Sequence, residues 1–245
     1  MLNEDRQDVH IGKLGENMRD TLKSKKYFDE FIEEDSKRIE RFVLKLEKGE
    51  VRQERVLPVK RKIHDLKLGI LIARYSKGDK ISVLKNAFIE LYREWEEVFQ
   101  PEYYNKNLMM ISLAVLFDVG KEQIERMKNL LKNTAVEDWV FEFMLNEMLG
   151  HDTNENIPLL FPKNYMTLKQ AAFADKPIPL LKKYLSEEWY NTDCGCYEAH
   201  KSSQKIYYGY WSFEAGAFAK ILQLDDKDLK KTPYYPYDMI HCIKQ

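Results

Sequence analysis

The sequence predicts an all-α protein built from many helices packed together, without a regular helical repeat. Apolar residues recur along most of the chain at spacings of three, four and seven, which place them on one face of a helix. The alternating pattern of a half-buried strand is not convincing anywhere, and no unit repeats with a period of about 30 to 50 residues. A chain of 245 residues can bury a sizeable core. We expect two helical halves packed together, residues 1–130 and residues 131–245.

The first two helices are predicted from one amphipathic and one largely buried segment. Apolar residues in the range 28–46 share one helical face, and this helix should end near Gly49. A second helix is expected to begin around Pro58, because proline is tolerated in the first turn of a helix. It has apolar residues on more than one side and should therefore be central. Gly78 should end it, and Asp79 should be the N-cap of the next helix.

Further apolar periodic segments predict the remaining helices. They cover about residues 84–99, 104–117, 121–131, 136–149, 164–174 and 179–190. The polar stretch 150–163 contains prolines and is expected to be a loop, and residues 191–196 should form a turn. Asp225 or Asp226 should cap a short helix at residues 227–230.

The last long predicted helix lies within residues 207–226 and has a glutamate on an apolar, aromatic face. The residues at helical spacing on this face are Tyr207, Trp211, Glu214, Phe218 and Leu222. Burying a lone carboxylate is costly, so Glu214 should find hydrogen-bond donors or have a raised pKa.

Glu214 has a structural and a catalytic interpretation. In the structural one, which we favour, it accepts hydrogen bonds from backbone N–H groups or from the tyrosine hydroxyls of the loop 233–238, which two prolines stiffen. In the catalytic one, Glu214 and Asp238 act in a helical cleft together with His200 or His241.

The charge balance favours a protein partner over nucleic acid. The formal net charge is only −1 although 32% of the residues are charged, whereas a dedicated nucleic-acid binder needs a basic surplus. Acidic residues outnumber lysines between residues 134 and 200. An acidic half suits a basic protein partner, so we expect no direct contact with nucleic acid.

Neither a membrane nor a cofactor is expected. The N-terminal segment lacks the hydrophobic region of a signal peptide, and the longest apolar run, 108–117, is too short to span a bilayer. The three cysteines are expected to be free thiols in the cytoplasm. Cys194, Cys196, Asp193 and His200 lack the spacing and the second ligand pair of a structural zinc site. We predict no metal and no cofactor.

Two motifs of the C-terminal half, YWSFEAGAFAKILQLDD and PYYPYDM, resemble the C-terminal domain of the PoNi immunity proteins. The segments LGILIARYSKGDKISVLKNA and NLMMISLAVLFDV resemble the helical N-terminal domain found with it. The resemblance spans roughly residues 15 to 242. It implies an all-α, cytoplasmic antidote that binds and blocks a PoNe-type DNase toxin. Such toxins are delivered by bacterial secretion systems, type VI secretion among them.

The resemblance also implies roles for particular residues. The signature positions, expected to maintain the fold or to shape the binding face, are Trp211, Phe213, Glu214, Ala215, Asp225, Asp226, Tyr235, Pro236, Tyr237 and Asp238. A basic nuclease should be met by acidic residues with aromatic anchors beside them. The first choice for this face is Glu187, Glu188, Asp193 and Glu198, with Trp189, Tyr190 and Tyr197 as anchors, and the second is Glu137, Asp138 and Glu142. The alternatives are the enzyme outlined above and a helical adaptor without a toxin partner. A homo-oligomer is not predicted.

Overall fold

The computed structural model describes residues 18–134, 137–191 and 196–241. Within these residues the regular structure consists of ten α-helices with short π- and 3₁₀-helical turns, and it contains no strand. The predicted all-α fold is therefore confirmed. None of the helices in this part of the chain has the length and apolar character needed to cross a lipid bilayer.

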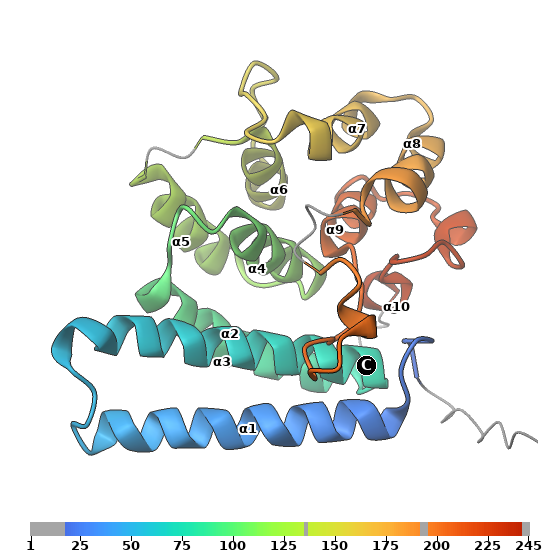
Figure 1. The fold of residues 1–245 in the computed structure, drawn as a ribbon. Coiled ribbons are helices and arrows are strands. Elements are labelled where there is room, and N and C mark those ends of the chain that lie inside the picture. The colour runs from blue at the N-terminus through green and yellow to red at the C-terminus, as the bar shows by residue number, and fades with distance from the viewer. Residues whose placement is uncertain (1–17, 135–136, 192–195, 242–245) are drawn as a thin grey trace, which may run out of the picture.

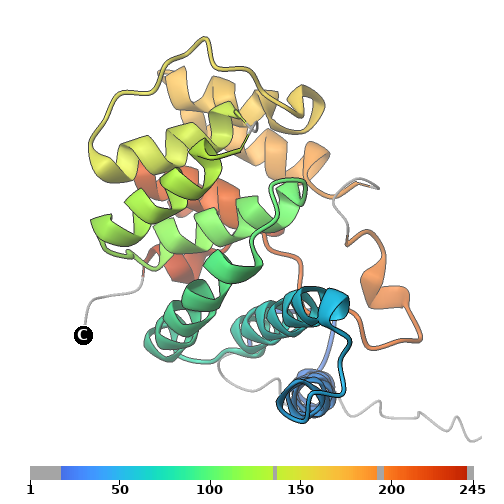
Figure 2. The ribbon, with the colours of Figure 1, turned by 90° about the vertical axis from the view of Figure 1, so that its left-hand side faces the viewer.

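The helices follow the predicted order closely. The first five are α1 (Lys25–Glu47), α2 (Gln53–Lys77), α3 (Ile81–Val98), α4 (Tyr104–Leu116) and α5 (Lys121–Lys132). The others are α6 (Trp139–Leu149), α7 (Pro162–Phe173), α8 (Pro177–Lys183), α9 (Phe213–Ile221) and α10 (Tyr237–Ile240). A π-helical turn at Tyr184–Glu188 continues α8, and 3₁₀ turns occupy Ala199–Lys201 and Lys227–Leu229. Figures 1 and 2 show α1 and α2 as a long antiparallel pair on one side of the molecule, with α4 and the later helices stacked on the other.

One hydrophobic core joins the early and late helices. It includes Trp95 of α3, Trp139 of α6 and Phe218 of α9, each at most 1% exposed. Such side chains stabilise the fold by removing large apolar surfaces from water. A second, smaller cluster joins α1 and α2 to the extended segment before α9, and its members are Phe28, Phe31, Ala73, Tyr207 and Tyr210. The segment 207–211 therefore connects the α1–α2 pair to the rest of the molecule.

Two helix boundaries differ from the prediction. Helix α2 begins at Gln53, so Pro58 lies inside the helix and not at its start. A proline near the N-terminal end sacrifices only one backbone hydrogen bond, which the rest of the helix tolerates. Gly78 ends α2 with a φ of 106°, as predicted. Asp79, however, is not the next N-cap, because its carboxylate accepts from Arg74 Nε at 2.7 Å and pairs with Lys77 Nζ at 3.5 Å.

The prediction of a single helix from Tyr207 was wrong at its N-terminal end. Helix α9 begins only at Phe213, with Ser212 as its N-cap, and residues 206–212 belong to no helix or strand. Gly209 has a φ of +119°, which a helix does not accommodate. Tyr207 and Trp211 therefore do not share a helical face with Glu214, although their spacing in the sequence suggests one.

His64 is a buried residue of α2, 1% exposed. Its Nε2 lies 3.2 Å from the carbonyl oxygen of Leu91, and burial lowers its pKa from 6.5 to about 4. A folded pKa below the unfolded one gives stability that is present above pH 6.5 and is lost as the pH falls toward 4. Acidification from pH 7 to pH 5 should thus lower the free energy of unfolding through His64 by about 2 kcal/mol.

Urea unfolding of wild type and His64→Gln at pH 5, 6 and 7 measures this contribution. The Gln variant should lose less stability than wild type over this interval, because its side chain does not titrate. Equal losses in both proteins would show that His64 is not responsible.

Candidate functional site

The first turn of α9 holds a buried carboxylate with several donors around it. Glu214 accepts a hydrogen bond from Tyr184 Oη at 2.8 Å and another from Ser212 Oγ at 2.8 Å. The side chain of Trp189 also hydrogen-bonds to it. Burial raises the pKa of Glu214, and these donors act in the opposite direction because they favour the ionised form. Glu214 therefore fastens α9 to the π-helical turn Tyr184–Glu188.

The partners of Glu214 differ from those predicted. The loop 233–238 was expected to supply tyrosine hydroxyls or backbone N–H groups, but the tyrosine that donates is Tyr184, which lies 30 positions before Glu214 in the chain. Nothing local in the sequence indicates Tyr184. Ser212 could have been found, since a serine directly before an apolar helical segment is a preferred N-cap.

The tyrosine loop instead serves a second buried carboxylate, Asp226. Tyr235 Oη donates to Asp226 Oδ2 at 2.5 Å, and His241 Nε2 lies 2.6 Å from Asp226 Oδ1. Asp226 is 1% exposed and stands before the 3₁₀ turn Lys227–Leu229, but its side chain makes no cap hydrogen bond there. Its carboxylate joins the chain after α9 to the C-terminal end.

Other signature residues connect the C-terminal part to α2. Trp211 Nε1 donates to Ser76 Oγ at 2.8 Å, and the indole packs edge-on against Tyr75 with ring centroids 4.9 Å apart. Phe213 contacts the same ring at 5.9 Å. Phe213 is buried and Trp211 is half-buried, and both join the C-terminal part of the chain to α2.

The small residues of the EAGA motif allow the tyrosine loop to approach α9. Ala215 is fully buried, and a Cβ on Gly216 would lie 2.6 Å from Cγ of Pro236. Close approach of this kind requires glycine on the helix. Tyr237 packs on His241 with centroids 4.2 Å apart.

The two remaining signature aspartates lie at the surface. Asp238 Oδ2 accepts from Arg19 Nε at 2.9 Å, and its side chain is 56% exposed. Asp225 pairs with Lys227 at 3.3 Å and is 74% exposed. Neither carboxylate joins Glu214, so the structure does not assemble the Glu214 and Asp238 pair of the enzyme interpretation.

The predicted aromatic anchors form one cluster of packed aromatic rings. Trp189 lies 4.8 Å and Tyr190 5.3 Å from Tyr234, measured between ring centroids. Tyr190 also contacts Tyr197 at 5.2 Å and Tyr210 at 5.0 Å. Trp189 and Tyr190 are half-buried, whereas Tyr197 is 47% exposed. Tyr197 is thus the member of the cluster that a partner can cover most fully.

The acidic residues beside this cluster differ in how they are engaged. Glu187 is exposed. Glu188 accepts from Thr167 Oγ1 at 3.0 Å and pairs with Lys183 at 3.2 Å. Glu198 pairs with Lys201, and its backbone N–H donates to Tyr190 Oη at 2.8 Å. Asp193 lies outside the described residues.

One residue of the second predicted acidic group, Asp138, does not lie at the surface. Asp138 is 1% exposed and is the N-cap of α6, where its Oδ1 accepts from Val140 N at 2.9 Å and from Tyr104 Oη at 3.0 Å. It cannot be a surface contact, so its assignment to the binding face was wrong. The sequence could have indicated this capping role, because an aspartate directly before an apolar helix is a preferred N-cap. Glu137 is exposed, and Glu142 lies 3.8 Å from Lys128.

Potential metal ligands do not come together in the described parts of the chain. No group of three histidine, cysteine, aspartate or glutamate side chains is close enough there to hold an ion. Cys196 is half-buried, and Nδ1 of His200 lies 2.7 Å from Tyr210 Oη. Cys194 lies outside the described residues.

Fold and site together define an all-helical protein in which buried carboxylates and tyrosines fasten the C-terminal part. Family models match both parts of the chain: the N-terminal model of the PoNe immunity proteins (PoNi) matches residues 19–129, and the C-terminal model matches residues 136–239. The chain therefore belongs to the family of PoNe immunity proteins, whose members are associated with immunity to PoNe nuclease toxins. The resemblance found in the sequence is confirmed.

A solved structure shares this fold. The crystal structure of protein PA2201 from Pseudomonas aeruginosa superposes with a TM-score of 0.59, covering 76% of this chain and 74% of that chain. The two sequences are 16% identical, so the similarity concerns the fold alone. A search of curated proteins found no match.

Proposed function

We propose that this protein is a cytoplasmic immunity protein that binds a cognate PoNe-type DNase toxin and inhibits it without catalysis or a cofactor. The observation that carries the proposal is the match of both family models, which together cover residues 19–129 and 136–239. The toxin would reach the cell through a bacterial secretion system, such as a type VI secretion system. Inhibition would protect the producing cell and its kin.

The surface proposed for toxin binding combines Tyr197 with Glu187 and Glu198. Tyr197 presents a large ring that already packs against the ring of Tyr190, so covering it costs little side-chain entropy. A DNase needs a basic surface to bind DNA, and carboxylates opposite that surface speed association. This surface is supported by three half-buried neighbours, Glu188, Trp189 and Tyr190. The second candidate surface is formed by Glu137 and Glu142.

We expect the triple variant Glu187→Lys, Tyr197→Ala, Glu198→Lys to bind the toxin at least about 30-fold more weakly than wild type. The salt dependence of the association rate should also decrease, because two attractive charges become repulsive. Surface plasmon resonance at low and high ionic strength measures both effects.

A matched control reverses two carboxylates elsewhere, Glu90→Lys and Glu122→Lys. Their side chains are 69% and 71% exposed and pair with arginines on their own helices. The control should leave affinity unchanged. Equal affinity of the triple variant and wild type would refute this location of the interface.

Co-expression with the toxin encoded beside this gene tests the function itself. Cell survival together with a stoichiometric complex on co-purification is expected. Growth arrest without a complex, although the protein is folded, would refute the proposal. A catalytically inactive toxin should still co-purify, because the proposed inhibition depends on binding alone.

A further inference from the structure

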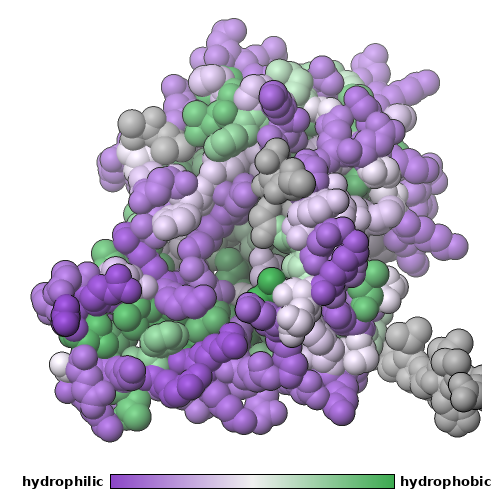
Figure 3. Space-filling view, in the orientation of Figure 1, coloured by the Kyte–Doolittle hydropathy of each residue, from purple (hydrophilic) through white to green (hydrophobic). Residues whose placement is uncertain are grey.

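The outer part of the α1–α2 pair projects beyond the core. None of residues 36–62 is buried, although this range holds the C-terminal half of α1 and the first turns of α2. Leu44 is 48% exposed and Val43 is 36% exposed. Figure 3 shows hydrophobic residues in a band between α1 and α2, with hydrophilic residues on both sides. This end of the pair therefore presents apolar side chains, Val43 and Leu44 among them, that are not buried among the residues the structure describes.

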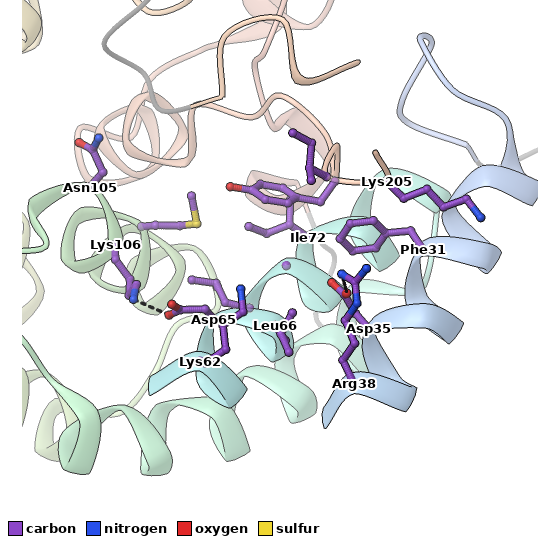
Figure 4. Close-up of a pocket in the computed structure, with 15 residues that line it drawn as sticks. Phe31, Asp35, Arg38, Lys62, Asp65, Leu66, Ile72, Asn105, Lys106 and Lys205 are labelled. Atoms are coloured by element: carbon purple, nitrogen blue, oxygen red, sulfur yellow. Dashed lines mark hydrogen bonds and ion pairs between the residues drawn. The ribbon is translucent and has the colours of Figure 1, made fainter. Parts of the chain in front are cut away.

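The band is hollowed. A cavity of about 400 Å³ lies where α1, α2, α4 and the segment 205–208 meet, with Phe31, Ile72 and Met109 among its apolar lining residues (Figure 4). A second hollow of about 560 Å³ continues along α1 past Phe42 and Leu44. Arg38 and Lys62 line both, so the two hollows adjoin, and together they are called the α1–α2 groove.

The charges along this groove are predominantly positive. Six cationic side chains line it, Arg38, Arg41, Lys45, Lys62, Lys106 and Lys205, against three carboxylates, Asp35, Asp65 and Glu50. Three of the cations are already paired: Arg38 with Asp35 at 2.8 Å, Lys106 with Asp65, and Lys205 with Glu30 at 2.9 Å and Glu34 at 2.5 Å. Across the described residues, Arg41, Lys45 and Lys62 form no salt bridge. These three cations are therefore available to an incoming carboxylate.

The length and shape of the groove suit a stretch of polypeptide. From Phe31 to Lys45 the helical rise gives about 21 Å, which matches about six extended or about fourteen helical residues. A compact small molecule would fill only one of the two hollows. Binding to a lipid surface requires a protruding apolar face, whereas the α1–α2 groove is concave.

We propose that the α1–α2 groove binds an acidic amphipathic segment of a partner protein. Its leucine- or phenylalanine-like side chains would enter the apolar floor, and its carboxylates would pair with Arg41, Lys45 and Lys62. The groove has the opposite charge from the acidic face around Tyr197, so the two surfaces favour partners of opposite charge. The inference does not depend on the proposed function.

Selection from a phage-displayed library of random twelve-residue peptides tests the groove. Wild type should enrich peptides that place Asp or Glu beside Leu or Phe. The variant Arg41→Glu, Lys45→Glu, Lys62→Glu should bind the selected peptides at least tenfold more weakly in fluorescence anisotropy. Leu44→Ser, which alters an exposed position only, should also weaken binding.

The matched control reverses three exposed lysines elsewhere, Lys132, Lys176 and Lys182, and should bind like wild type. Selected peptides that are neutral or basic, or equal binding by the groove variant, would overturn the proposal. Sedimentation of wild type with phosphatidylserine vesicles, lost in the groove variant, together with no peptide enrichment, would assign the surface to a membrane instead.

Discussion

Replacement of Gly209 by alanine is expected to lower the free energy of unfolding by about 3 kcal/mol or more. Gly209 has a φ of +119°, which residues with a side chain rarely adopt. A Cβ at this position would lie 2.0 Å from Ser76 Oγ and 2.5 Å from Trp211 Nε1. Both backbone strain and a steric clash therefore oppose the substitution.

The clash falls on the contact that holds the segment before α9 against α2. Ser76 Oγ donates to the carbonyl oxygen of Tyr208 at 2.7 Å and accepts from Trp211 Nε1 at 2.8 Å. Moving Ser76 aside would weaken both hydrogen bonds and separate α2 from the C-terminal part. The tryptophan of the signature motif would lose its partner as a consequence.

Gly49→Ala is the matched control for this prediction. Gly49 also has a positive φ, +67°, but a Cβ there would meet no atom within 4 Å. The Gly49→Ala substitution should therefore lower the free energy of unfolding by only about 1 kcal/mol, which is the cost of the backbone strain alone. Urea unfolding of the two variants separates strain from clash, and equal losses would show that the contact with Ser76 is unimportant.

The helices could be predicted because burial imposes a regular spacing on apolar residues. Helices α1, α3 and α5 follow this pattern closely, and Gly78 ends α2 where a left-handed residue is needed. These signals are local and therefore visible in the sequence. The segment 207–211 has aromatic residues at helical spacing but is not helical, because the burial of these residues depends on packing against α1 and α2.

The candidate site could be predicted only in part, for the same reason. An isolated glutamate in an apolar motif correctly suggested that Glu214 is buried and satisfied by donors. Its partner Tyr184 comes from a distant turn, and only the tertiary structure brings the two together. Asp138 shows the opposite case: its place directly before an apolar helix predicts an N-cap, and the structure has it buried in that role.

Glu214→Leu is expected to lower the free energy of unfolding by about 3 kcal/mol or more, because Tyr184 Oη and Ser212 Oγ would lose their buried acceptor. The double variant Glu214→Leu, Tyr184→Phe should be less destabilised than the sum of the two single variants, since it removes one stranded donor along with its acceptor. Thermal and urea unfolding of wild type, the two single variants and the double variant measure the four stabilities that this comparison needs. Strict additivity would show that the hydrogen bond carries no stability.

Glu214→Gln separates the structural from the catalytic role through pH. Burial raises the folded pKa of Glu214 above 4.5, so its contribution to stability is complete below that pH and is lost as the pH rises toward the folded pKa. Raising the pH from 4 to 8 should therefore shift the difference in unfolding free energy in favour of the Gln variant. The effect has the opposite sign to that of His64, so the two groups can be distinguished.

The same variant should still protect cells against the toxin at temperatures where it is folded, because Gln keeps the size of Glu214 and can still accept from Tyr184. A catalytic carboxylate would behave differently: protection would disappear although stability was unchanged. Loss of protection at normal stability and with an intact toxin complex would thus restore the enzyme interpretation. Protection that follows stability across Glu214→Gln and Glu214→Leu would assign the signature glutamate to the framework that presents the toxin-binding surface.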